Sequence, residues 1–329
     1  MRFPSYFPRL FRPPVYQGRR HAKNYFEGWY YKHVDATGKH IWSVIFGVSH
    51  SADPHSFIQV IEGTGGETDY IRFDIADFSY DTDQLRVTIG KNIITGQYMQ
   101  LDLSGDKFSI RGRVEYSETT PFPQKLTAPG IMGWYTYAPF MECYHGVVSM
   151  NHGISGRLEI NSANIDFTGG KGYIEKDWGR SMPSDWVWLQ CNHFDDAPGA
   201  SLMVSVARIP WLTGHFPGFL SFFRLNGTVY RFATYNRSVI EHIGVDQDAV
   251  KMRLRNRRHI LELEVERNIS GELKAPVKGE MERKIAESLD AGMLITLKAK
   301  SGKVLYHGQG AHAGLEIVGD VEQYIRLLK

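Results

Sequence analysis

The chain has 329 residues, of which 42% are hydrophobic and 22% charged. This composition is typical of a globular protein with a buried core and argues against a disordered or fibrous chain. The formal net charge of +2 is too small to indicate nucleic acid or an acidic membrane as an obligate partner. Two cysteines, Cys143 and Cys191, form no CxxC or Cys/His metal spacing, and a chain of this length needs no disulfide framework, so a reducing compartment fits best.

The N-terminal segment, residues 1–20, reads MRFPSYFPRLFRPPVYQGRR. Arginines and prolines interrupt its apolar residues, so it lacks the continuous apolar region of a signal peptide. We predict an extended arm that packs on its own domain, with peripheral contact to a membrane surface as the alternative. No stretch approaches the roughly 20 apolar residues of a membrane-spanning helix. We therefore expect a cytoplasmic protein, peripheral to a membrane at most.

The next residues predict antiparallel strands, because turn signals recur about every ten residues. Apolar and polar residues alternate in several candidate strands, which places one face of each on a core. The clearest candidates are IWSVIFGVS (41–49), SFIQVIEG (56–63), DYIRFDIADFSY (69–80) and QLRVTIG (84–90). One helix is predicted over 279–292, where Met281, Ile285 and Leu289 recur at i, i+4 and i+8.

An internal repeat divides the chain. The stretch GWYYKHVDATGKHIWSVIFGVS from Gly28 is similar to DWVWLQCNHFDDAPGASLMVSVARI from Asp185. Further on, SFIQVIEGTGGETDYIRF is similar to GFLSFFRLNGTVYRF, and LRVTIGKNIITGQYMQLDLS to VKMRLRNRRHILELEVERNIS. A long repeat of almost pure β pattern predicts two tandem antiparallel barrels with few short helices. We place the first barrel at 21–168 and the second at 169–329, with the boundary in the turn TGGKG (168–172).

Two segments combine carboxylates with tryptophan: YFEGWYYK (25–32) and YIEKDWGRSMPSDWVWLQCNHF (173–194). On a strand, Trp186, Trp188, Gln190 and Asn192 all project to one side. An aromatic face that ends in amides suits a pocket for an apolar ligand with one polar end. A barrel core whose two amides bind backbone groups is the alternative.

Glu27 and Glu175 are each followed by a tryptophan two or three residues later. A carboxyl group against aromatic rings has its charged form disfavoured and can donate a proton. Alternatively, Glu27 forms an ion pair with Lys32, Arg180 or Arg19 that ties strands together. The pattern leaves both interpretations open.

Other motifs indicate no metal and no nucleic acid. His145 and His152 are seven residues apart, and HxH, HxxxH and HExxH spacings are missing from the sequence. In the basic run KMRLRNRRH (251–259), the cations alternate with apolar residues, and LELEVE follows with glutamates at the same period. A hairpin would place these cations opposite those glutamates on the solvent face.

The two tryptophan-rich segments resemble the tocopherol cyclase family. FEGWYYK is similar to that family's FEGWYFK block, EKDWGRSMPSDWVWLQCN to its EKNWG...P..W.W.QCN block, and AGLEIVG (313–319) is a further, weaker match. The resemblance spans about residues 21–319 and implies two lipocalin-like barrels, in a fold group that also includes carotenoid hydratases. The chain departs from the plant pattern at Asp177, where that pattern has Asn, and at Tyr31, where it has Phe.

The resemblance implies acid-catalysed cyclisation of a prenylated quinol or a similar hydrophobic isoprenoid, an isomerisation that needs no cofactor. It makes Glu27, Glu175 and Asp177 the candidate acids. The residues implied to bind the hydrophobic small-molecule substrate are Trp29, Tyr31, Lys32, Trp178, Arg180, Trp186, Trp188, Gln190 and Asn192. Two alternatives stay open: a non-catalytic lipocalin-like binder of a hydrophobic metabolite, and a hydratase of an isoprenoid double bond.

Overall fold

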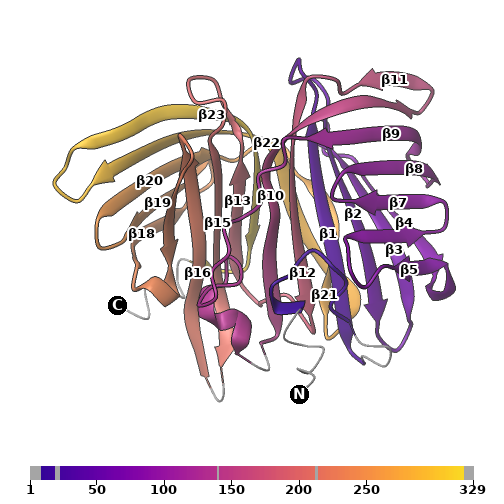
Figure 1. The fold of residues 1–329 in the computed structure, drawn as a ribbon, viewed down its shortest axis with the longest axis horizontal. Helices are drawn as coiled ribbons and strands as arrows, with labels where there is room; N and C mark the ends of the chain where they lie inside the picture. Colours follow the sequence, from indigo (N-terminus) through magenta and orange to yellow (C-terminus); the bar gives the residue numbers. More distant parts are fainter. Residues whose placement is uncertain (1–8, 19–22, 139–140, 212–213, 322–329) are drawn as a thin grey trace. The chain divides into compact units, whose positions relative to one another are not determined.

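The computed structural model describes residues 9–18, 23–138, 141–211 and 214–321. The elements named within these ranges are 23 strands and three short 3-10 helices (Figure 1). The predicted all-β class is therefore confirmed. A search of the described residues for a helix long and apolar enough to cross a membrane finds none.

The chain divides into two compact units. Unit 1 comprises Met1–Met182 and Glu272–Lys284, and unit 2 comprises Pro183–Gly271 and Ile285–Lys329. This division differs from the predicted boundary at 168–172, because residues 170–179 form a strand in the middle of the first sheet. A Gly-rich turn does precede that strand, but it is a turn within unit 1.

The first sheet is antiparallel and has the order β4-β3-β2-β1-β12-β10-β9-β8-β7-β6-β5, with β11 paired to β10 (Figure 1). The predicted strands at 41–49, 56–63, 69–80 and 84–90 are all found, the third one interrupted by a 3-10 helix. The elements in chain order are β1 (Tyr25–Val34), β2 (Ile41–His50), β3 (His55–Glu62), β4 (Thr68–Asp74), η1 (Ile75–Asp77), β5 (Phe78–Tyr80), β6 (Arg86–Ile89), β7 (Asn92–Thr95), β8 (Tyr98–Ser104), β9 (Ser109–Ser117), η2 (Gly133–Tyr137), β10 (Cys143–Ile160), β11 (Ala163–Asp166) and β12 (Gly170–Gly179).

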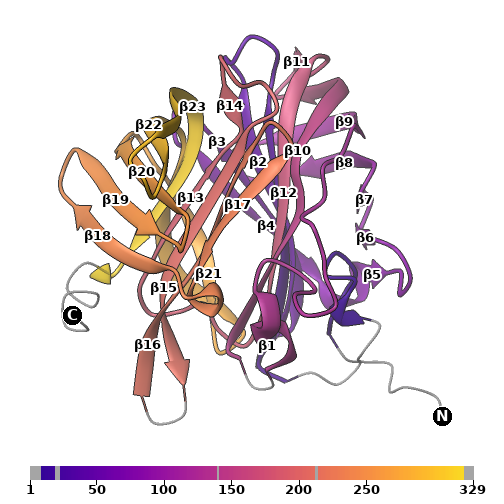
Figure 2. The same ribbon diagram turned by 60° about the vertical axis from the view of Figure 1, so that its left-hand side comes forward.

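The second sheet has the order β17-β16-β15-β13-β23-β22-β20-β19-β18, with β14 paired to β23 and β21 to β22 (Figure 2). Its elements are β13 (Trp186–Cys191), β14 (His193–Phe194), β15 (Ser201–Trp211), β16 (Gly214–Leu225), β17 (Thr228–Ala233), η3 (Thr234–Asn236), β18 (Val239–Val245), β19 (Ala249–Arg255), β20 (His259–Glu266), β21 (Gly271–Val277), β22 (Glu280–Ala299) and β23 (Val304–Val318).

The order of strands in the two sheets accounts for the sequence repeat. Each sheet contains a block of four neighbouring strands from the first part of its unit, and the block is paired with a strand from later in the chain. The block β4-β3-β2-β1 is paired with β12, and the block β17-β16-β15-β13 is paired with β23. The first two aligned stretches of the repeat coincide with these four-strand blocks. By sheet order the counterparts of β19 and β20 are β8 and β9, so the third sequence alignment is shifted by one hairpin.

The predicted helix at 279–292 is wrong, because this stretch lies in the long strand β22. Met281, Ile285 and Leu289 are spaced by four residues. This spacing is close to one helical turn of about 3.6 residues, and it is also twice the strand repeat of two. On β22, Ile285 and Leu289 are buried, and the even spacing places all three residues on one face. The spacing alone therefore could not separate the two periods.

Each unit has its own apolar core. In unit 1 the core includes Trp29, Phe46 and Ile58, and in unit 2 it includes Val187 and Phe223. The strand residues between these core positions project to the other face of each sheet. This alternation decides which of the candidate site residues can contact one another.

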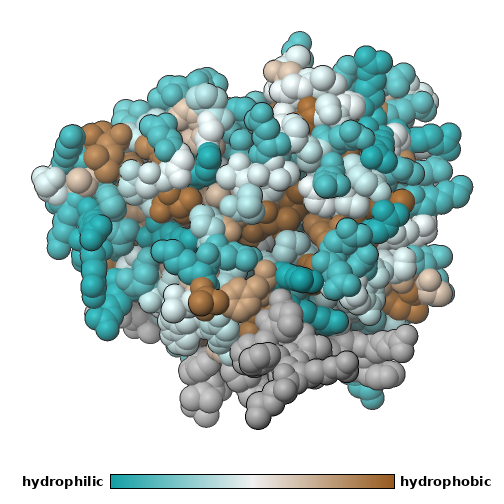
Figure 3. Space-filling view, viewed as in Figure 1, coloured by the Kyte–Doolittle hydropathy of each residue, from teal (hydrophilic) through white to brown (hydrophobic). Residues whose placement is uncertain are grey.

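The basic run folds as the hairpin that the sequence predicts. In β19 and β20, Lys251 lies opposite Glu264 and Arg253 opposite Glu262. The Lys251 ammonium is 2.9 Å from Glu264, and Arg253 contacts Glu262 as well as Glu241 at 2.8 Å. In the space-filling view, hydrophilic side chains predominate at this end of unit 2, with hydrophobic patches between them (Figure 3).

Candidate functional site

The first tryptophan-rich segment lies beside the start of the second in the first sheet. β1 and β12 pair antiparallel, with Gly28 opposite Asp177 and Tyr30 opposite Glu175. Directly opposite residues of a pair project to the same face. The two carboxylates of β12 therefore share one face with Gly28 and Tyr30, the face that does not carry the core.

On that face, His145 of β10 lies between the two carboxylates. Its Nδ1 is 2.9 Å from Asp177 Oδ1, and its Nε2 is 3.5 Å from Glu175 Oε2. The Tyr173 hydroxyl donates to the same Glu175 oxygen at 2.7 Å. β10 positions the imidazole, because its register with β12 places His145 opposite Asp177. We call His145, Glu175 and Asp177 the carboxylate–histidine cluster.

The cluster keeps its imidazole protonated. Burial by itself lowers the pKa of His145, but the charges of Asp177 and Glu175 and the hydrogen bond to Asp177 outweigh it and raise that pKa to about 9. His145 is 12% exposed in its side chain, so water screens these charges weakly. At neutral pH the cluster therefore holds a proton on the imidazole, within hydrogen-bond distance of a carboxylate.

Asp177 is the most accessible carboxylate of the cluster. Its Oδ1 accepts the His145 hydrogen bond, while no hydrogen bond from a described residue reaches Oδ2. The side chain is 20% exposed. At Gly28, opposite Asp177, an added Cβ would find its nearest neighbour at 3.7 Å, so the backbone leaves room beside the carboxylate. A small group of a ligand can approach Asp177 from this side.

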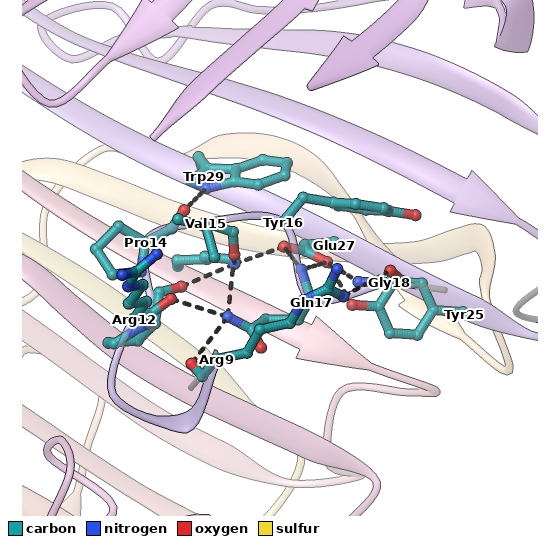
Figure 4. Close-up of polar contacts among 12 residues, drawn as sticks. Arg9, Arg12, Pro14, Val15, Tyr16, Gln17, Gly18, Tyr25, Glu27 and Trp29 are labelled. Carbon is teal, nitrogen blue, oxygen red and sulfur yellow. Dashed lines mark hydrogen bonds and ion pairs between the residues drawn. The ribbon is translucent and has the colours of Figure 1, made fainter. Parts of the chain in front are cut away.

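Glu27 lies on the opposite face of the sheet, in a buried ion pair. Its Oε1 is 2.5 Å from the Lys176 ammonium, and both side chains are fully buried. The backbone N–H groups of Gln17 and Gly18 donate to its carboxylate at 2.8 and 3.0 Å, and the Tyr25 hydroxyl donates to it as well (Figure 4). The ion-pair interpretation of Glu27 therefore describes its geometry, with Lys176 as the partner in place of Lys32 or Arg180; Arg19 lies outside the described residues.

Lys176 connects this ion pair to the N-terminal arm. Its ammonium donates to the backbone carbonyls of Pro13 and Val15 at 2.8 and 2.5 Å. It also lies 4.9 Å from the ring centroid of Trp29 and 4.8 Å from that of Trp178. Burial lowers the pKa of Lys176 to about 8, and the carboxylate of Glu27 opposes that shift. We call Glu27 and Lys176 the arm clamp.

Three aromatic residues predicted to bind substrate pack against the protein itself. Trp29 and Tyr31 are fully buried in the core of unit 1. The indole N–H of Trp29 donates to the carbonyl of Pro14 at 2.8 Å (Figure 4). The hydroxyl of Tyr31 donates to a backbone carbonyl of β7 at 2.9 Å. Trp178 stacks on Tyr144 with ring centroids 5.6 Å apart.

The two predicted cations take different positions. Lys32 is buried on the face of the cluster, opposite Tyr173. Arg180 directly follows β12 and is exposed, and its backbone N–H donates to the carbonyl of Glu142 at 2.7 Å. Of the two, Lys32 alone shares the face of the carboxylate–histidine cluster.

The second half of the second segment belongs to unit 2. Trp186, Trp188 and Gln190 lie on β13 between the core residues, so they project away from the core of that unit, and Asn192 follows them; all four are buried. The indole N–H of Trp186 donates to Glu316 at 2.6 Å. Within the described part of the chain, neither the Oε1 nor the Nε2 atom of Gln190 has a hydrogen-bond partner, although the side chain is fully buried. This face therefore has the aromatic-to-amide grading that the sequence predicts.

The carboxylate–histidine cluster is also a candidate cation site. One ligand atom from each of its residues lies within 4.8 Å of the other two. Imidazole and carboxylates are ligands for several divalent cations. Because a metal ligand must be deprotonated, a cation would compete with the proton that Asp177 and Glu175 stabilise on His145. The sequence predicts no metal, and activity after treatment with a chelator would test that prediction.

Two residues of these sites were missed from the sequence for different reasons. Lys176 had a readable signal: it alternates with Glu175 and Asp177, so on a strand it must face the other side, where a buried lysine needs a carboxylate such as Glu27. His145 had none, because its contact with Asp177 depends on the pairing of β10 with β12, which no local pattern encodes.

Comparisons with known proteins agree with the fold and with the two later blocks, EKDWGRSMPSDWVWLQCN and AGLEIVG, whereas FEGWYYK (26–32) lies before the residues that the family model matches. The family described as tocopherol cyclase-like matches residues 107–319, which is more than half of the chain. Tocopherol cyclase of maize, Zea mays, a chloroplastic protein, is 32% identical over 153 residues, 44% of this chain and 31% of the maize protein. The chain thus matches less than a third of the length of this curated relative.

Two solved structures share the fold. The AttH structure from Nitrosomonas europaea is 15% identical with a TM-score of 0.52, covering 92% of this chain and 98% of that chain. The structure of CghA with Sch210972 is 10% identical with a TM-score of 0.53, covering 93% of this chain and 89% of that chain. At these identities the likeness concerns the lipocalin-like two-domain fold alone.

Proposed function

Because the chain belongs to the tocopherol cyclase-like family, we propose that it catalyses acid-initiated addition of an oxygen nucleophile to a double bond of a hydrophobic isoprenoid. A prenylated quinol is the substrate class that we favour, since its own phenol supplies the nucleophile. The observation that carries the proposal is Asp177, a carboxylate with one open oxygen beside a protonated imidazole.

In this mechanism, the cluster donates a proton to the substrate and is reprotonated at the end of the reaction. Asp177 receives the proton from His145 along their 2.9 Å hydrogen bond and delivers it to one alkene carbon. Positive charge develops on the tertiary carbon, the phenol oxygen bonds to that carbon, and the phenol proton returns to the cluster. Atoms balance without a cofactor, and the product has the mass of the substrate. The charge of Glu175 helps to raise the pKa of His145 and so keeps the imidazole protonated before the reaction.

The substitution Asp177→Asn tests the donor. The plant block of the family carries Asn at this position, so we expect the fold to accept the amide. We expect turnover of prenylated quinols to fall at least about a hundredfold, the typical contribution of a positioned general acid. Asp102→Asn, which changes a partly exposed, ion-paired carboxylate of the same unit, is the matched control and should keep full turnover.

The same assay identifies the other outcomes. Full activity of Asp177→Asn together with loss of activity in Glu175→Gln would move the donor to Glu175. A product heavier by one water would assign a hydratase, and binding without any product would assign a carrier. Glu27→Gln should keep its turnover per folded molecule, because Glu27 faces the arm.

Treatment with a chelator tests the metal alternative at the cluster. We expect activity to survive dialysis against EDTA, since a proton on His145 leaves no imidazole lone pair for a cation. Loss of activity on dialysis and its return with one divalent cation would contradict the proton-donor mechanism.

A further inference from the structure

Unit 1 contains a hollow that the cluster does not use. Its volume is about 500 Å³, within the range of small-molecule sites. It is lined by the arm residues Phe11, Arg12, Pro14 and Val15, by Val148, Ser149 and Ile174 of the sheet, and by the loop residues Asp83, Gln84, Leu85, Gly96, Thr119 and Gln124, four of which are polar. Ile174 alternates with Glu175 on β12, so the hollow and the cluster lie on opposite faces of that strand.

An irregularity in β10 shapes the sheet side of this hollow. The register between β10 and β12 shifts between Val147 and Ser149. A bulge of this kind re-aims side chains and lets consecutive residues reach one side. Val148 and Ser149 both line the hollow as a result. One of the two is apolar and the other offers a hydroxyl.

The arm forms one side of the hollow and is fixed at two points. Inside, the arm clamp binds the backbone of residues 13–18 through Glu27 and Lys176 (Figure 4). At the surface, the guanidinium of Arg12 is 3.5 Å from Asp83, in the loop before β6. The inner attachment is buried and charge-assisted, while the outer pair is exposed and weak. The arm is therefore anchored mainly through its buried side.

A chain of polar side chains begins at Ser149. Its hydroxyl donates to the carbonyl of Asn151 at 3.1 Å and lies 3.1 Å from His152 Nδ1. Burial lowers the pKa of His152 to about 3, so the imidazole is neutral. Because the serine gives its one proton to Asn151, the hydrogen bond between them requires the tautomer in which His152 Nδ1 donates to the serine. The serine oxygen therefore keeps one lone pair for a further donor. A ligand with a single hydroxyl or N–H can use it.

We propose that this hollow is a second ligand site, for a neutral and largely apolar small molecule that donates one hydrogen bond to Ser149. Apolar contacts come from Phe11, Val15, Val148 and Ile174. The ligand enters past the arm, at the exposed Arg12–Asp83 pair. The site is distinct from the carboxylate–histidine cluster.

The test uses the neutral fluorescent probe N-phenyl-1-naphthylamine, an apolar molecule with one N–H, and the full-length chain. Gly96 lines the hollow, and a Cβ added there meets no atom within 4 Å, so a larger side chain has open space beside it and we expect Gly96→Phe to obstruct the hollow. Gly130→Phe is the matched control, because Gly130 has equally open surroundings but does not line the hollow. We expect Gly96→Phe to weaken probe binding at least about tenfold and Gly130→Phe to leave it unchanged.

Two further variants keep the test decisive. If Gly96→Phe does not fold, Ser149→Ala tests the site in its place. We expect this variant to weaken probe binding several-fold, because it removes one hydrogen bond. Asp177→Asn should bind the probe like the wild type, which separates this site from the proposed reaction. The proposal is overturned if the wild-type protein does not bind the probe, or if Gly96→Phe and Ser149→Ala both bind it as the wild type does.

Discussion

Three consecutive charged residues of β12 serve two different structural purposes. Glu175 and Asp177 project to the face of His145, while Lys176 between them projects into unit 1 toward Glu27. The alternation of a strand makes this separation unavoidable. A motif that reads as one charged block, EKDW, thus supplies a candidate proton-transfer site and the anchor of the arm.

Removal of the lysine should expose the cost of a buried charge. In Lys176→Met, Glu27 stays buried without its counter-ion, and we expect the free energy of unfolding to fall by about 3 to 5 kcal/mol. The double variant Glu27→Gln, Lys176→Met should recover part of that loss, because no charge remains to be compensated. Urea denaturation measures both. Equal stabilities of the single variant and the wild type would show that the pair is not formed.

Protonation of His145 makes stability depend on pH in a predictable direction. Its pKa is raised in the folded protein, to about 9 from an unfolded value near 6.5, so the stabilisation is complete below about pH 6.5 and is lost as pH rises through about 9. The upper limit of this contribution is about 3 kcal/mol. We expect His145→Gln to lose less stability than the wild type between these limits, in urea denaturation at matched pH. Parallel curves for the two proteins would contradict the charge assignment.

Among the elements, β12 has the greatest influence on both sites, and its last glycine sets how closely β10 can approach. Gly179 has a φ of +150°, and a Cβ there would lie 2.1 Å from the carbonyl oxygen of Glu142. Gly179 pairs with Cys143, two residues before His145. The glycine that ends EKDWG is therefore required by backbone geometry next to the cluster.

Substitutions at two glycines of this sheet should separate stability from activity. Gly179→Ala must displace backbone and should cost about 2 kcal/mol of stability along with turnover. Gly28→Ala meets no close atom, so it should keep stability but lower kcat/KM by covering Asp177. Thermal unfolding and steady-state kinetics on both variants check this. If Gly28→Ala keeps full activity, the substrate does not approach over Gly28.

Some strands could be predicted from the sequence and others could not, depending on the spacing of their apolar residues. Strands with alternating burial, such as β6 and β8, could be predicted from their period. β22 could not, since its apolar spacing of four fits either period. Contacts within one strand, such as the shared face of Trp186 and Trp188, followed from the sequence. Contacts between distant strands, such as His145 with Asp177, did not.

At the scale of the whole molecule, the repeat predicted two similar sheets but not where the chain passes between units. Residues 272–284 belong to unit 1 although both neighbouring stretches belong to unit 2. The hydrogen bonds of Gln59 with the backbone of Lys274, at 2.9 and 2.8 Å, fix this excursion. A single glutamine on β3 gives no signal for a contact so far along the chain, so a boundary placed from the repeat and a Gly-rich turn does not include residues 272–284.

The nearly neutral charge of the molecule, +2 overall, leads to a prediction about partners. The cations of β19 are compensated locally: Lys251 by Glu264, Arg253 by Glu262 and Glu241, and Arg255 by Glu241. Because phosphate binding requires uncompensated cations, we expect no measurable binding to duplex DNA at about 150 mM salt in fluorescence anisotropy. Replacing Glu241, Glu262 and Glu264 together by glutamine should create salt-dependent binding, since the same cations then lose their partners. Salt-dependent binding of duplex DNA by the wild type would mean that these ion pairs do not hold in solution.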